Sequence, residues 1–82
     1  MARIYLGAPL QDLTGGVDEI ELEVSTVRAL IKELDRRYPG IAESLEASGF
    51  ALAINGEIIA HPAYEVIPED AEVHFIFAIQ GG

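Results

Sequence analysis

A chain of 82 residues has room for one domain, and this chain carries no cysteine and a net charge of −9. Half of its residues are apolar and 23% are charged, which is typical of a folded soluble domain. The lack of cysteine excludes a disulfide framework, a thiolate metal site and a cysteine nucleophile, and the negative charge argues against nucleic acid or an anionic membrane as a partner. The first residues form neither a signal peptide nor a membrane span, so we expect a cytoplasmic protein.

The first 24 residues predict two strands joined by a long loop. Residues 3–7 alternate between apolar and polar side chains, which is the period of a half-buried strand. Residues 8–18 hold Pro9, Gly15, Gly16 and Asp18, which predict an irregular loop. Residues 19–24 alternate again and place three glutamates on one side. This acidic row is either a solvated strand face or a docking surface for a basic partner.

One helix is predicted after this second strand. Ser25 or Thr26 can cap its first turn, Pro39-Gly40 ends it, and its apolar side chains recur at helical spacing: Val27, Leu30, Ile31, Leu34 and Tyr38. The opposite side carries a basic stripe formed by Arg28, Lys32 and Arg36. We interpret this stripe, with an expected Glu33–Arg37 pair, as a solvated helix face.

The second half of the chain predicts three more strands. Residues 41–49 predict a short helical turn or loop in which Ile41 and Leu45 anchor the core. Asn55-Gly56 separates two short apolar runs, which is a strong hairpin signal. The last strand, residues 73–80, directs Val73, Phe75 and Phe77 to one side, while its other side carries Glu72, His74, Ile76 and Ala78 and becomes apolar toward its end.

The order of these elements is strand, strand, helix, strand, strand, strand. Such a short chain with a hairpin cannot form several crossover units, so a purely parallel sheet is excluded. The sequence predicts an α+β roll, in which a mixed sheet of about five strands packs on one main helix.

No set of catalytic side chains is visible in the sequence. His61 and His74 are the only histidines, and neither belongs to a recognisable Ser-His-Asp or metal-ligand pattern. Gly15-Gly16 lacks the lysine and the strand-to-helix context of a phosphate loop. Gly81-Gly82 follow the last predicted strand and could give a narrow tail that enters a channel in another protein, although a frayed end is the alternative.

Five features are distributed over the whole chain: the opening strand, Ser25-Thr26-Val27 with Ala29-Leu30, Asn55-Gly56-Glu57, Glu69-Asp70-Ala71-Glu72-Val73 and the final Gly81-Gly82. With these features the chain resembles the β-grasp sulfur carriers, which are similar to ubiquitin in fold. Its length is closest to the small subunit of molybdopterin synthase (MoaD type), and the thiamine sulfur carrier (ThiS type) is related. The resemblance implies one β-grasp domain over residues 1–82 with a flexible tail at 79–82.

The resemblance implies that Gly82 carries the covalent chemistry. An adenylating enzyme related to the ubiquitin activators would use ATP to convert the Gly82 carboxylate to an acyl-adenylate, and a sulfur source would turn the adenylate into a thiocarboxylate. Ile79, Gln80 and Gly81 would thread into the site of the partner. The chain would then be a carrier and not itself an enzyme, with no bound cofactor and no metal.

Docking is expected near the end of the last strand. Ile76, Phe77 and Ala78 are candidates for contact with the activating enzyme and with a sulfur-accepting large subunit, such as the catalytic subunit of molybdopterin synthase. Core packing is the alternative for Phe75 and Phe77.

Several functions stay open at this point. Molybdopterin carriers usually have a Pro-Pro pair before the tail and a small residue before Gly-Gly, whereas this chain has Phe77-Ala78-Ile79-Gln80. The sulfur could therefore serve another cofactor, cysteine or a specialised metabolite. A ubiquitin-like modifier joined to lysines through Gly82 and a non-covalent interaction domain are further alternatives.

Overall fold

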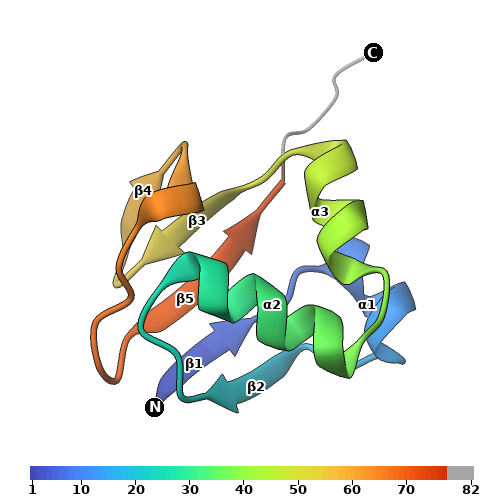
Figure 1. The fold of residues 1–82 in the computed structure, drawn as a ribbon, viewed down its shortest axis with the longest axis horizontal. Coiled ribbons are helices and arrows are strands. Elements are labelled where there is room, and N and C mark those ends of the chain that lie inside the picture. Colours follow the sequence, from blue (N-terminus) through green and yellow to red (C-terminus); the bar gives the residue numbers. More distant parts are fainter. Residues whose placement is uncertain (78–82) are drawn as a thin grey trace.

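In the computed structural model of the chain, which describes residues 1–77, helices cover one face of a five-stranded mixed sheet (Figure 1). The strand order is β2-β1-β5-β3-β4, with β1 parallel to β5 and all other neighbours antiparallel. The predicted α+β class and the five strands are confirmed. The elements are β1 (Ala2–Tyr5), α1 (Ala8–Thr14), β2 (Glu19–Leu22), α2 (Val27–Arg37), α3 (Ile41–Ser48), β3 (Ala51–Ile54), β4 (Glu57–Ile59), the 3-10 turn η1 (Pro62–Tyr64) and β5 (Glu72–Ile76).

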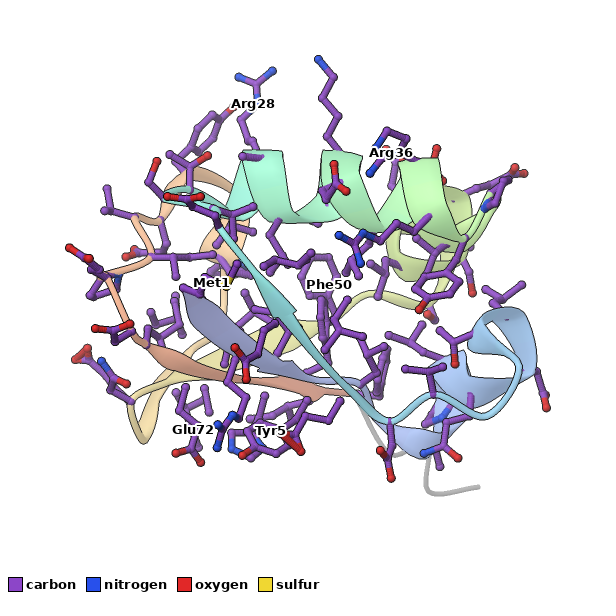
Figure 2. All side chains as sticks on the ribbon, turned by 90° about the horizontal axis from the view of Figure 1, so that it is seen from below. Met1, Tyr5, Arg28, Arg36, Phe50 and Glu72 are labelled. Carbon is purple, nitrogen blue, oxygen red and sulfur yellow. The ribbon has the colours of Figure 1, made fainter. Side chains whose placement is uncertain are left out.

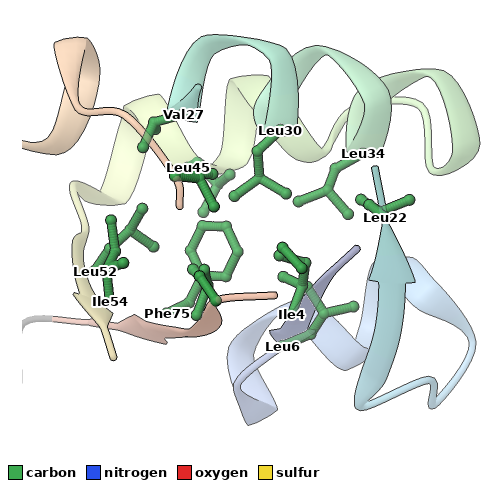
Figure 3. Packing of buried hydrophobic residues seen from close by; sticks show 14 of the residues in the cluster. Ile4, Leu6, Leu22, Val27, Leu30, Leu34, Leu45, Leu52, Ile54 and Phe75 are labelled. Carbon is green, nitrogen blue, oxygen red and sulfur yellow. The ribbon is translucent and has the colours of Figure 1, made fainter. Parts of the chain in front are cut away.

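The hydrophobic core lies between the sheet and helices α2 and α3. Every second residue of the central strands points into it, because side chains alternate between the two faces of a strand. Figure 3 shows the aliphatic side chains of α2 facing these strand residues. Burying one such side chain stabilises the fold by about 1.5–3 kcal/mol. The fully buried members include Ile4, Leu30, Leu34, Leu52 and Val73.

Helix α2 has the boundaries that its sequence predicts. The Oγ1 of Thr26 accepts a hydrogen bond from the backbone N–H of Ala29 at 3.1 Å, so Thr26 is the N-cap. The predicted ion pair is also present, with Arg37 Nε 2.9 Å from Glu33 Oε2, and Arg36 bonds the same carboxylate. Hydrogen bonds from Arg36 and then Arg37 lower the pKa of Glu33 from 4.5 to about 2.

The prediction of a loop over residues 8–18 is wrong, because residues 8–14 form helix α1. The proline that suggested a loop lies in the first turn of this helix, where a missing N–H costs nothing. Gly15 then ends the helix with φ of 69°, which glycine adopts without strain. The helix is anchored by Leu10, which is 1% exposed, and by Thr14, whose hydroxyl donates to the carbonyl of Val17 at 2.8 Å.

Residues 41–48 also form a helix, α3, so residues 1–77 contain three α-helices, of which α2 is the longest. Ile41 and Leu45 are buried, which confirms them as core anchors. None of the helices within the described range is long and apolar enough to cross a membrane.

The predicted hairpin turn is present between β3 and β4. Asn55 and Gly56 have φ of 50° and 85°, as the turn requires. The Asn55 Oδ1 also accepts a hydrogen bond from the Glu72 N–H at 2.9 Å, which ties the turn to the start of β5. Strand β5 ends at Ile76, and residues 78–80 of the longer strand that the sequence predicts lie outside the described residues.

Candidate functional site

The candidate site is the face of the sheet that the helices leave uncovered, which we call the open face. Figure 2 shows Tyr5 and Glu72 on this side of the molecule, while Arg28 and Arg36 project from α2 on the opposite side. Alternation along each strand assigns its side chains to the two faces. The open face carries Arg3, Tyr5, Glu19, Glu21, Ala51, Ala53, Ile58, Glu72, His74 and Ile76.

One half of the open face is charged. Arg3 stands between Glu21 of β2 and Glu72 of β5 in the strand register. Its Nε lies 3.3 Å from Glu19 Oε1 and its Nη2 lies 3.6 Å from Glu21 Oε1. Interaction with Tyr5, followed by the charges of the two glutamates, raises the pKa of Arg3. One cation thus faces several acids, so this half would attract a basic partner surface.

The centre of the open face is a stacked pair of rings. The rings of Tyr5 and His74 are almost parallel, at 5°, with centroids 4.3 Å apart. The Nε2 of His74 also lies 2.9 Å from Glu72 Oε1. Both contacts fix the orientation of His74, which is half-buried. Nowhere in residues 1–77 do three or more histidine, aspartate or glutamate side chains gather closely enough to hold a metal ion.

The other half of the open face is apolar and shallow. Ile76 lies opposite Ala51, and Ala53 lies between His74 and Ile58 in the register. Ile58 is 70% exposed, and the side chains of Ala51 and Ala53 on β3 are too short to project far above the sheet. Sequence reasoning did not include these alanines, although their alternation with the buried Leu52 and Ile54 marks them as outward. The apolar end that the sequence predicts for this face extends across β5, β3 and β4.

The structure separates two of the predicted docking residues. Ile76 lies on the open face, whereas Phe77 packs against the core cluster on the helical side. The Cε2 of Phe77 is 3.2 Å from the position that a Cβ on Gly7 would occupy, so its ring lies directly over this glycine. Phe75 is 7% exposed, and its predicted core packing is confirmed. Ala78, Ile79, Gln80, Gly81 and Gly82 lie outside the described residues, and their roles stay predictions.

Solved structures of three other proteins share the fold. A chain of the Amycolatopsis orientalis BexX/CysO complex matches with a TM-score of 0.85 and 19% identity over 100% of both chains. SAMP1, the small archaeal modifier protein 1 of Methanosarcina acetivorans, matches with a TM-score of 0.78 and 21% identity, over 99% of this chain and 95% of that one. A candidate molybdopterin converting factor, subunit 1, from Pyrococcus furiosus matches with a TM-score of 0.64 and 24% identity, over 95% of this chain and 97% of that one.

Sequence comparison gives the family directly. No curated protein matches the chain. The model of the ThiS family matches residues 4–82, which include nearly the whole chain and both final glycines. Together with the mixed five-stranded sheet and its helices, this match means that the chain belongs to the ThiS family of β-grasp, ubiquitin-like sulfur carriers.

Proposed function

We propose that the chain carries sulfur as a thiocarboxylate on Gly82. The observation that carries this proposal is the family match, which continues through Gly81 and Gly82. The open face supports it, because it offers a partner enzyme a docking surface beside β5, the strand that leads toward the two glycines.

The chemistry begins with activation of an unreactive group. A terminal carboxyl has a pKa of about 3.5 and is ionised at neutral pH, so it resists nucleophiles. A carboxylate oxygen of Gly82 attacks the α-phosphorus of ATP, and pyrophosphate leaves. A sulfur nucleophile at the oxidation level of hydrosulfide then attacks the carbonyl carbon of the acyl-adenylate. AMP leaves, one proton is released, and the thiocarboxylate remains.

The chain itself positions the Gly82 carboxyl group and keeps it accessible to the partner enzyme. Glycine at both final positions has no Cβ to crowd the carbonyl, and with Gln80 and Ile79 these residues thread into the partner's site. We assign docking to Ile76 and Ala78, with the alanines of β3 as further contacts. Phe77 fixes the start of this segment through its contact with Gly7. ATP, the sulfur source and every catalytic group belong to the adenylating partner.

The proposed sulfur acceptor is the large, catalytic subunit of molybdopterin synthase, so that this chain would act as the small subunit. The chain length and the resemblance to MoaD-type carriers support this choice. Cysteine or another sulfur-containing metabolite is the alternative product, because residues 77–80 differ from the molybdopterin pattern. The reaction is placed in the cytoplasm, where ATP is available.

The test is the intact mass of the chain after incubation with its adenylating enzyme, ATP and a sulfur source. The expected result is a gain equal to the mass difference between sulfur and oxygen, confined to the C-terminal peptide. A chain that lacks Gly82 is the control and should not change. An unchanged mass in the natural chain, with the enzyme shown to release pyrophosphate, would refute the proposal. Incubating the thiocarboxylate with candidate acceptor subunits then identifies the pathway.

The alternative function uses the same activated Gly82 to modify lysines of other proteins. It is favoured by the fold shared with SAMP1, which is named as a modifier protein. Covalent conjugates that disappear when Gly82 is deleted would establish it. A protein that keeps its cellular activity without the two glycines would instead be a non-covalent interaction domain.

A further inference from the structure

A second surface lies on the helical side of the molecule, in a groove bordered by α2, α3 and η1. The groove has a volume of about 620 Å³, enough for several side chains of a partner. Its walls and floor are mostly apolar, and three of the side chains are alanines that leave space above them. The apolar members are Ala29, Ile31, Ala42, Leu45, Phe50 and Ala63.

The rim of this groove is basic. Arg28 and Lys32 stand one helical turn apart on α2 and are exposed, and among residues 1–77 the only acid that lines the groove with them is Glu46 of α3. The chain has fourteen acids and five basic residues, so partners for cations are abundant. Yet among the ion pairs formed within residues 1–77, none involves Arg28 or Lys32, whereas Arg3, Arg36 and Arg37 are all paired.

We propose that this groove binds an acidic, amphipathic segment of a partner protein. Apolar side chains of the segment would cover Ile31, Leu45 and Phe50, and two of its carboxylates would pair with Arg28 and Lys32, whose spacing on the helix is about 6 Å. The net charge of −9 disfavours nucleic acid and anionic membranes, whose long-range repulsion two cations do not offset. A second copy of this chain is disfavoured because two copies with a net charge of −9 each repel one another.

The groove goes beyond the proposed sulfur chemistry because it uses another side of the molecule. Figure 2 shows Arg28 on the side opposite Tyr5 and Glu72, which belong to the open face. A segment bound in the groove therefore leaves the open face accessible. The carrier could then be held by one partner while another acts at the open face.

The experiment selects random displayed peptides on the whole natural chain and uses the enriched peptides as probes. The peptides should combine acidic and apolar residues, and amide NMR shifts should map their binding to residues 29–32, 42–46 and 50. Neutralising both rim cations in the double variant Arg28→Gln/Lys32→Gln should weaken binding about tenfold. Raising the salt concentration should also weaken it.

Two control variants make this test specific. Arg36→Gln/Arg37→Gln removes the same charge from the same helix but away from the groove, and it should leave affinity unchanged. Ala29→Gln narrows the groove with no change of charge, and it should weaken binding several-fold. Deleting Gly82 should have no effect, which separates this proposal from the sulfur chemistry.

Several results would overturn the proposal. These are a selection that enriches no peptide, enriched peptides without acidic residues, shifts confined to the open face, or equal binding to the two double variants. Duplex DNA and anionic vesicles are tested in parallel. If either of them binds more tightly than the peptides, and this binding is lost in the double variant Arg28→Gln/Lys32→Gln, the groove is assigned to that partner instead.

Discussion

Asn55 contributes to stability in two ways that substitutions can separate. Its backbone has φ of 50°, which side chains other than asparagine, aspartate and glycine adopt at a cost of about 1 kcal/mol. Its Oδ1 accepts the hydrogen bond from Glu72 at 2.9 Å, which is worth about 1 kcal/mol. Asn55→Ala loses both and should lower the free energy of unfolding by about 2 kcal/mol. Asn55→Gly keeps the turn and should lose about 1 kcal/mol.

Urea unfolding followed by circular dichroism measures these differences, and amide hydrogen exchange at Glu72 reports on the hydrogen bond itself. Exchange at Glu72 should accelerate in both variants, because both lack the acceptor. If Asn55→Ala and Asn55→Gly lower the free energy of unfolding equally, the contribution of the backbone conformation is refuted. A glycine variant as stable as the natural chain, with unchanged exchange at Glu72, would refute the contribution of the hydrogen bond.

Three further predictions concern the helix and the open face. Thr26→Ala should lower the free energy of unfolding by about 1 kcal/mol in urea, while Thr26→Ser, which keeps the capping oxygen, should lose much less. Because the pKa of Glu33 is lowered from 4.5 to about 2 in the folded state, its contribution to folding stability is complete above pH 4.5 and declines as the pH falls toward 2. The difference in urea midpoint between the natural chain and Glu33→Gln should therefore shrink over this range. A difference that stays constant with pH would contradict the assignment. Ala53→Arg adds a cation to the apolar half of the open face and should raise the KM of the adenylating enzyme about tenfold, whereas Ala47→Arg, at an exposed position of α3, should not.

The sequence was most informative where local patterns determine the structure. Helix α2 could be predicted because its apolar spacing, its Thr26 cap and its Pro39-Gly40 end all agree. Helix α1 was missed because a proline and a glycine are turn formers in one context and helix start and stop signals in another. What decides between these contexts is the burial of Leu10, which depends on residues distant in the sequence.

The site was harder to predict for the same reason. The alternation of β5 placed Ile76 on the outer face, but no local pattern tells which strands lie beside it. The parallel pairing of β1 with β5 joins residues about 70 positions apart and brings Tyr5 against His74. This pairing shows that His74, which the sequence placed on the outer side of the last strand without a role, is fixed in the centre of the open face.

The two proposed surfaces differ in charge as a consequence of the fold. Helices cover one face of the sheet, so the other face and the outer side of α2 are both left to solvent on opposite sides of the molecule (Figure 1). Four of the five basic residues lie in α2, whereas the strands of the open face carry glutamates with Arg3 alone among them. A basic partner surface should therefore prefer the open face, and an acidic segment should prefer the groove. Raising the salt concentration should weaken both contacts, and exchanging Arg28 and Lys32 for glutamine should weaken only the second.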